Sequence, residues 1–298
     1  MNAVTRRTFL LGLLASGCAA GGPEGEVVVA AGERGGFYFD FATLLAAQLE
    51  PGLRPRVLAT RGSVDNLGVL GRGEAHLALT HADAAHAADP ALELRAIGRV
   101  YENYLQFVVR SDDPARSVPD LAGRVVSLGA EGSGAALIGD RVFASLGLHG
   151  SARVEHLPLA EAAAALAQRR VDALLWSGGV PTPALARLDG IRLLPMAELL
   201  PGLRAAHGSV YEQVSVPAGV YEATQEVATV GVANLLVCHA RLPDDLVAAI
   251  TRTLLDRAAA LVPEQALGTQ FLDVRSLIGT VGVPLHPGAA TTYRTVHG

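Results

Sequence analysis

Lysine is absent from the 298-residue sequence, so every basic side chain apart from histidine is an arginine. Without lysine the chain cannot perform Schiff-base chemistry, and it cannot contain a Walker-type phosphate loop, whose lysine contacts the phosphates. Cysteine is scarce, with two residues, Cys18 and Cys238. Cys238 lies in the apolar run 234–238 and is predicted to be a buried thiol, while Cys18 belongs to the export segment described below. We therefore expect no intrachain disulfide.

The histidines form no pattern that is typical of a metal site. His76, His81 and His86 lie close to Asp83 in the sequence, but steps of five residues do not align on one face of a helix. The remaining candidates, His239 and His286, are predicted to be structural. We expect neither a metal nor another cofactor.

A long apolar run is also missing. A membrane-spanning helix needs roughly 20 apolar residues, and no stretch of that length lacks charges or turn residues. The formal charge is −5, and loss of residues 1–17 would remove Arg6 and Arg7 and no acidic residue, which gives −7. A mildly acidic chain argues against nucleic-acid binding, which requires a basic surface.

The N-terminal segment has the pattern of an export signal. Arg6 and Arg7 precede the apolar run 9–15, and small residues lead to Cys18, as in a secretory signal with a lipoprotein-type cleavage site. Residues 5–11, Thr-Arg-Arg-Thr-Phe-Leu-Leu, resemble the twin-arginine signal.

We expect residues 1–17 to be removed, Cys18 to carry lipid and residues 18–25 to form a tether. The protein would then be extracytoplasmic, in the periplasm or at the outer face of the plasma membrane, anchored to the membrane by its lipid. Ala15 stands where the lipobox usually has leucine. The alternative is an ordinary signal cleaved nearby, which leaves Cys18 unmodified or removes it.

Beyond the tether, strand-like and helix-like segments alternate. The predicted strands are 26–31, 57–60, 75–80, 105–110, 124–128, 153–157 and 171–176. The predicted helices are 39–49, one that begins at Ser63 as its N-cap, one from the glycine loop 129–134 to about 146, 159–169 and 243–262. This order is typical of mostly parallel sheets with helices on both faces.

Two such series, one inserted into the other, predict an α/β protein with two lobes. Lobe 1 would comprise residues 26–110 and 228–298, and lobe 2 residues 111–227. The polar turn after residue 110 marks the first crossing, and the apolar run 227–237 marks the return. Ligands in open α/β sheets bind beyond the carboxyl ends of the strands, so two opposed lobes would enclose a binding cleft.

The loop of residues 127–134 is the first candidate for ligand contact. Gly132, Ser133 and Gly134 let the backbone approach a ligand closely, and the following helix offers free N–H groups at its positive end. Such a site binds a carboxylate or phosphate without a cationic side chain. The alternative is a tight turn in which Ser133 caps the helix. The spacing does not match a nucleophile elbow.

Two further loops belong to the predicted cleft, and Tyr101, Trp176 and Ser177 are expected beside it. Gly36, Phe37 and Tyr38 would form a stacking wall, unless Phe37 belongs to the core. Arg61 would pair with a carboxylate, unless it is a solvated surface residue. The full set of predicted ligand-binding residues is Gly36, Phe37, Tyr38, Arg61, Ser63, Asn66, Tyr101, Gly132, Ser133, Gly134, Trp176 and Ser177.

Taken in order, these loops resemble the TAXI group of TRAP-transporter solute-binding proteins. The segments that carry the resemblance are 35–38, 60–67, 129–134, 171–173, 179–181, 216–221 and 284–289. The resemblance implies a two-lobed type II periplasmic-binding-protein fold and a small carboxylate ligand, with glutamate and related dicarboxylates as the expected class. It also implies delivery to a TRAP membrane permease. We expect a monomer without enzymatic activity.

Two residues depart from the family pattern. After Gly-Gly the family usually has Tyr-Tyr-Pro, whereas here Tyr38 is followed by Phe39 and Asp40, and Asp40 would place a carboxylate near the pocket, which disfavours anions. Arg61 stands where the family usually has glycine, and it either compensates for Asp40 or shifts specificity. A sensory protein that signals to a membrane receptor is an alternative function. An enzyme on the same fold is another, although lysine, a nucleophile elbow and a metal cluster are missing.

Overall fold

The computed structural model describes residues 23–263 and 272–297. The predicted export signal and Cys18 lie outside the described residues. The strands are β1 Gly25–Ala30, β2 Leu53–Leu58, β3 Leu77–His81, β4 Leu94–Arg110, β5 Val125–Ser127, β6 Arg153–Glu155, β7 Ala173–Gly178, β8 Ile191–Leu194, β9 Tyr211–Val216 and β10 Val227–His239. The α-helices are α1 Phe37–Gln48, α2 Ser63–Gly71, α3 Ala82–His86, α4 Gly134–Ser145, α5 Leu159–Ala167, α6 Pro183–Ala186, α7 Leu200–His207, α8 Asp244–Asp256, α9 Val274–Leu277 and α10 Pro287–His297.

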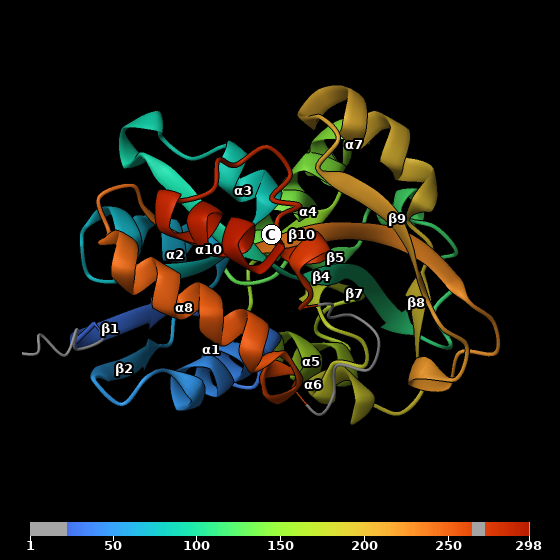
Figure 1. Cartoon of the computed structure of the whole chain (residues 1–298). Coiled ribbons are helices and arrows are strands. Elements are labelled where there is room, and N and C mark those ends of the chain that lie inside the picture. Colours follow the sequence, from blue (N-terminus) through green and yellow to red (C-terminus); the bar gives the residue numbers. More distant parts are fainter. Residues whose placement is uncertain (1–22, 264–271, 298) are drawn as a thin grey trace, which may run out of the picture.

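The strands form one continuous sheet in the order β2-β1-β3-β10-β4-β7-β5-β6, with β8 paired to β4 and β9 paired to β10. We call β1, β2 and β3 with α1, α2, α3, α8 and α10 the first lobe, and β5 to β9 with α4 to α7 the second lobe. Strands are parallel within the group β1, β2 and β3 and within the group β5, β6 and β7. In Figure 1 the first lobe lies on the left, β8, β9 and α7 lie on the right, and β10 runs from one to the other.

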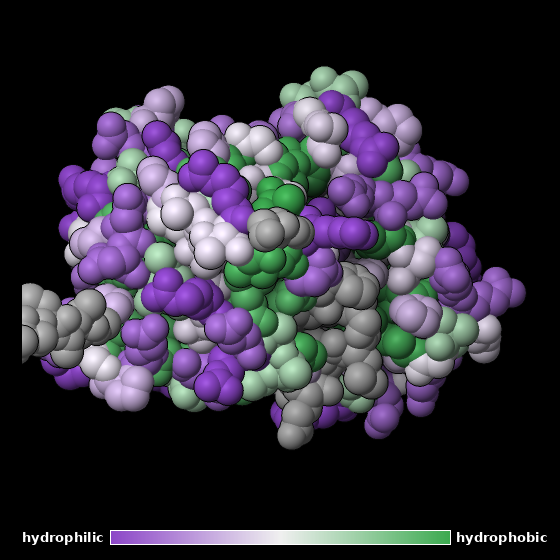
Figure 2. All heavy atoms as spheres, in the orientation of Figure 1, coloured by the Kyte–Doolittle hydropathy of each residue, from purple (hydrophilic) through white to green (hydrophobic). Residues whose placement is uncertain are grey.

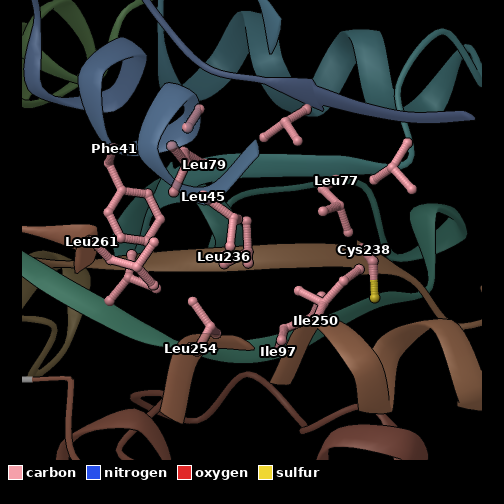
Figure 3. Packing of buried hydrophobic residues seen from close by; sticks show 14 of the residues in the cluster. Phe41, Leu45, Leu77, Leu79, Ile97, Leu236, Cys238, Ile250, Leu254 and Leu261 are labelled. Atoms are coloured by element: carbon pink, nitrogen blue, oxygen red, sulfur yellow. The ribbon is translucent and has the colours of Figure 1, made fainter. Parts of the chain in front are cut away.

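The first lobe has a core on each face of its sheet, because successive side chains of a strand point to opposite faces. Val27 and Val29 of β1 pack into the cluster that contains Phe41 of α1 and Ile250 of α8. Figure 3 shows this cluster, with side chains from α1, β3, β10 and α8 meeting over the sheet. Val28 packs into the opposite cluster with residues of α2 and α3. Helices therefore cover both faces, as the buried character of these strands requires.

Two long strands connect the lobes. The N-terminal part of β4 pairs with β10, and its residues 104–110 pair with β7 and β8. The N-terminal part of β10 pairs with β9, and its residues 234–238 pair with β3. Both strands thus change partners in their middle. The lobe boundaries expected after residues 110 and 227 stay predictions.

The two-lobed α/β fold predicted from the order of segments is confirmed. Cys238 is fully buried among the first-lobe core residues, and burial raises the pKa of its thiol to about 12. The N-cap assigned to Ser63 is wrong, because Gly62 is the N-cap of α2 and Ser63 is its first residue. The Ser63 hydroxyl instead bonds across to β3, which brings it to the site described next.

The face shown in Figure 2 carries α8 and α10 and is mainly hydrophilic, with apolar side chains gathered toward its middle. Within residues 23–263 and 272–297, no helix combines the length and the apolar character that crossing a membrane requires.

Candidate functional site

A small cavity lies between the lobes, at the carboxyl ends of the strands. The space open to the centres of water molecules is about 40 Å³, which is enough for a few waters. The lining residues are Gly32, Glu33, Gly36, Phe37, Tyr38, Arg61, Gly62, Ser63, His81, Asn103, Ser133, Gly134, Ala135, Trp176 and Ser177. They come from the β1–α1, β2–α2 and β5–α4 junctions and from the ends of β3 and β7, with Asn103 from β4 where it crosses between the lobes.

Glycines let the lobes approach each other closely around the cavity. A Cβ added at Gly134 would lie 2.3 Å from Nδ1 of His81 and 2.8 Å from Oγ of Ser63. A Cβ added at Gly179 would lie 2.7 Å from the Phe37 ring. Real Cβ atoms do not lie this close to other atoms. The present contact between the lobes therefore requires glycine, which has no side chain, at both positions.

The N-terminus of α4 supplies hydrogen-bond donors. Ser133 is the N-cap, and its hydroxyl accepts from the Ala136 N–H at 3.0 Å. The N–H groups of Gly134 and Ala135 have no acceptor within the helix, because the first turn of a helix lacks preceding carbonyls. Since these N–H groups stand at the positive end of the helix dipole and line the cavity, they suit an anionic group.

His81 faces the same point from the first lobe. Its ring is 2 % exposed, and Nε2 lies 2.9 Å from Nδ2 of Asn103 and 3.1 Å from Oγ of Ser177. With the Asn103 amide nitrogen donating to Nε2, the neutral ring carries its proton on Nδ1. Nδ1 is buried and has no hydrogen-bond partner among the residues that the structure describes. The ring therefore adds a donor beside the α4 N-terminus.

Burial lowers the pKa of His81 to about 4, although Asp83 acts in the opposite direction, and Arg141 contributes to the lowering. Between pH about 6.5 and about 4 the unfolded chain would bind a proton that the folded chain rejects. Stability linked to His81 is therefore complete above pH about 6.5 and is lost as the pH falls toward 4.

When the pH falls from 6.5 to 4, the free energy of unfolding of the wild-type protein should decrease by up to about 3 kcal/mol more than that of His81→Gln. Urea unfolding of both proteins across this range measures the difference. A constant difference, or an NMR titration of the His81 ring near pH 6.5, would show that the imidazole is solvated.

Other side chains that line the cavity also have polar atoms without a hydrogen-bond partner in residues 23–263 and 272–297. Oε2 of Glu33 accepts from the Leu159 N–H at 2.9 Å, at the start of α5, but Oε1 is buried and unpaired. Burial raises the pKa of Glu33, and its bond to Leu159 lowers it. Nε1 of Trp176 and Oδ1 of Asn103 are likewise buried without partners.

Arg61 is already engaged. Its guanidinium lies 3.3 Å from Oδ1 of Asp65, and its side chain is 57 % exposed. Hydrogen bonding to Asp65 raises the pKa of Arg61. Arg61 is therefore largely solvated, as one interpretation of the sequence expected, but it also lines the cavity, as the other requires. Asp40 lines a smaller neighbouring cavity together with Phe37 and Trp176.

Several hydrogen bonds join the lobes directly. The N–H groups of Val64 and Asp65 donate to the Gly132 carbonyl at 3.1 and 3.0 Å. Asp83 of the first lobe accepts from Arg141 and Tyr211 of the second, both at 2.7 Å. Together with the bond from Leu159 to Glu33, they hold the lobes closed around the cavity.

Nine predicted residues line the cavity, namely Gly36, Phe37, Tyr38, Arg61, Ser63, Ser133, Gly134, Trp176 and Ser177. Three do not. Asn66 is buried and donates to the carbonyls of Ala31 and Leu79. Tyr101 packs against Phe37 in the first-lobe core, and the Gly132 carbonyl is used between the lobes.

The sequence prediction missed Gly32, Glu33, Gly62, His81, Asn103 and Ala135 as lining residues. His81 ends β3, so the rule that ligands bind beyond strand ends pointed to it. Asn103 had no signal, because it lies within a strand.

Ser133→Ala tests the capping role. Loss of the bond to Ala136 should lower the free energy of unfolding by about 1 kcal/mol. Urea unfolding measures this effect. An unchanged stability in Ser133→Ala would contradict the cap.

Residues 29–296 match the family model described as the NMT1-like family. Among solved structures, XAC2383 from Xanthomonas citri bound to ATP is 14 % identical, with a TM-score of 0.52 over 91 % of this chain and 95 % of that one. The alkanesulfonate-binding protein SsuA from Xanthomonas axonopodis pv. citri bound to MOPS is 20 % identical, with a TM-score of 0.52 over 91 % and 84 %.

The arginine-bound form of truncated ArgBP from T. maritima is 13 % identical, with a TM-score of 0.51 over 77 % of this chain and 95 % of that one. At these identities the likeness concerns the fold, which these proteins share with the two-lobed sheet described above. The chain therefore belongs to the NMT1-like family and has the fold of the periplasmic solute-binding proteins.

Proposed function

We propose that this chain is an extracytoplasmic receptor that binds a small carboxylate, of the class that includes glutamate and related dicarboxylates. The observation that carries the proposal is the convergence of donors at the α4 N-terminus. The free N–H groups of Gly134 and Ala135 and the unpaired Nδ1 of His81 meet in one buried place. A carboxylate accepts several hydrogen bonds, whereas each of these donors is costly when it stays unpaired.

Binding would act on the arrangement of the lobes. Donors from α4 belong to the second lobe and His81 belongs to the first, so one anion contacts both. A ligand that contacts both lobes stabilises the closed form over the open form. Hinge closure would then be the signal that a membrane partner recognises.

We further propose that the partner is a TRAP permease and that the receptor is of the TAXI type. The ordered loop segments of the sequence support this assignment, among them residues 35–38 and 129–134, which both contribute to the cavity. The export signal and the lipid on Cys18 would keep the receptor at the membrane beside its permease.

Titration calorimetry with a panel of acids tests the carboxylate proposal. We expect at least one of L-alanine, L-glutamate, 2-oxoglutarate and succinate to bind with a Kd of about 1 µM or below, which corresponds to about 8 kcal/mol. The primary amides of the same acids should bind at least about tenfold more weakly, because they lose the charge-assisted bonds at α4. Binding of none of the acids, or equal binding of the amides, would contradict the proposal.

A further inference from the structure

Four side chains that line the cavity each have a buried polar atom without a hydrogen-bond partner among the described residues, and these atoms divide into donors and acceptors. His81 Nδ1 and Trp176 Nε1 carry protons and need an acceptor. Oε1 of Glu33 and Oδ1 of Asn103 have lone pairs and need a donor. All four side chains line the same cavity. A ligand that satisfies them must therefore offer both kinds of group, because a buried unpaired polar atom costs about 1 to 3 kcal/mol.

The charges of the lining lead to the same requirement. Glu33 and Arg61 are its ionisable side chains besides His81 and Tyr38, and Arg61 is paired with Asp65. His81 is neutral above pH about 4. Glu33 has no cationic side chain within ion-pair distance in the part of the chain that the structure describes. A dicarboxylate would add two negative charges beside this carboxylate and leave its Oε1 unpaired.

The Trp176 ring and the backbone carbonyl of Glu33 both lie close to Gly36. A Cβ added at Gly36 would lie 3.0 Å from the Glu33 carbonyl oxygen and 3.6 Å from the Trp176 ring. Both residues also line the cavity. Cations are attracted to the face of a tryptophan ring, so a tryptophan in the lining of the cavity is compatible with a cationic ligand group.

We propose that the ligand is a small zwitterion, whose carboxylate binds at the α4 N-terminus and whose ammonium group binds Oε1 of Glu33. This proposal rests on the carboxylate function proposed above and narrows it to amino acids over dicarboxylates and 2-oxo acids. Asn103 supplies a second acceptor for the ammonium group. Glu33 then links the ligand to Leu159 of α5 through its other oxygen, so that recognition of the ammonium group and closure of the lobes share one carboxylate.

Matched ligand pairs test the role of Glu33. L-alanine with pyruvate and L-glutamate with 2-oxoglutarate differ at the α-carbon, where one member has an ammonium group and the other a carbonyl oxygen. In calorimetry we expect the wild-type protein to bind the amino acid of at least one pair at least about 30-fold more tightly than its 2-oxo acid, an energy of about 2 kcal/mol. Glu33→Gln should reduce this ratio to about threefold or less.

Two features make the ratio informative. The glutamine carbonyl of Glu33→Gln can still accept from the Leu159 N–H, and any effect of the variant on closure alters both ligands of a pair equally. Glu161→Gln is the matched control, because Glu161 is an exposed carboxylate in the first turn of α5 that also acts electrostatically on Glu33. It should leave the ratio unchanged.

The outcomes separate the two proposals. Binding of both members with no preference for the amino acid, or a ratio that Glu33→Gln leaves unchanged, would overturn the role of Glu33 while the carboxylate function stands. Tighter binding of the 2-oxo acid by the wild-type protein would do the same. Binding of none of the four probes would overturn the role of Glu33, and if succinate also failed to bind, the carboxylate function would be overturned with it.

Discussion

Gly134→Ala is expected to weaken ligand binding by about 100-fold or more while the protein stays folded. The new Cβ would lie 2.3 Å from the His81 ring, which is 2 % exposed and cannot turn aside into solvent. Overpacking of this kind typically costs about 1 to 3 kcal/mol, and a rigid ring against the first residue of a helix belongs at the upper end. In an open form the two lobes are apart and the same methyl group meets nothing.

Calorimetry for affinity, together with small-angle X-ray scattering with and without ligand, measures this effect. Gly202→Ala is the control, since Gly202 lies within α7 and a Cβ there has no neighbour within 4 Å. That variant should bind as the wild type does. Equal affinity in Gly134→Ala would mean that the ligand-bound form does not have the close contact between Gly134 and His81.

Arg141→Met should produce the second large effect. We expect it to destabilise the closed form relative to the open form by about 3 to 5 kcal/mol, because it leaves a buried carboxylate without its cation. The Asp83 side chain has no exposed surface, and one of its oxygens accepts from both Arg141 and Tyr211. When the lobes separate, Asp83 parts from both groups of the second lobe and gains water. The penalty therefore falls on the closed form.

Measurements of ligand affinity and of thermal stability distinguish the loss of the Asp83–Arg141 ion pair from a general packing defect. We expect the affinity of Arg141→Met to fall about 100-fold or more, with a smaller change in the melting temperature of the unliganded protein. The double variant Asp83→Asn with Arg141→Met should recover part of the lost affinity, since no charge is then left unpaired. A double variant that is as weak as the single one would contradict the role of the ion pair.

Much of the fold could be predicted because its strands carry simple signals. Val27 to Val29 form a run that is apolar on both faces, and such runs require helices above and below the sheet. Strands followed by glycine loops and helices then imply parallel order. The change of partners inside β4 and β10 had no local signal, because an apolar strand has the same pattern in either lobe.

The candidate site was predictable to the extent that it lies on loops after strands. Gly134 and Ser133 were found in this way, and the pattern also suggested the cap that Ser133 forms. Asn66 was placed at the site because it is polar and follows a strand, but such a residue can equally hold backbone carbonyls, as it does for Leu79. The unpaired Oε1 of Glu33 depends on packing between the lobes, which no local pattern records.

Native mass spectrometry of the protein isolated from the envelope of the cells that make it tests the central claim most directly. We expect one small molecule bound per chain, which is released when the protein is unfolded and carries a carboxylate group. The complex should be lost in Gly134→Ala isolated in the same way. A bound molecule without a carboxylate, or one retained equally by Gly134→Ala, would contradict the assignment of this cavity as a carboxylate site.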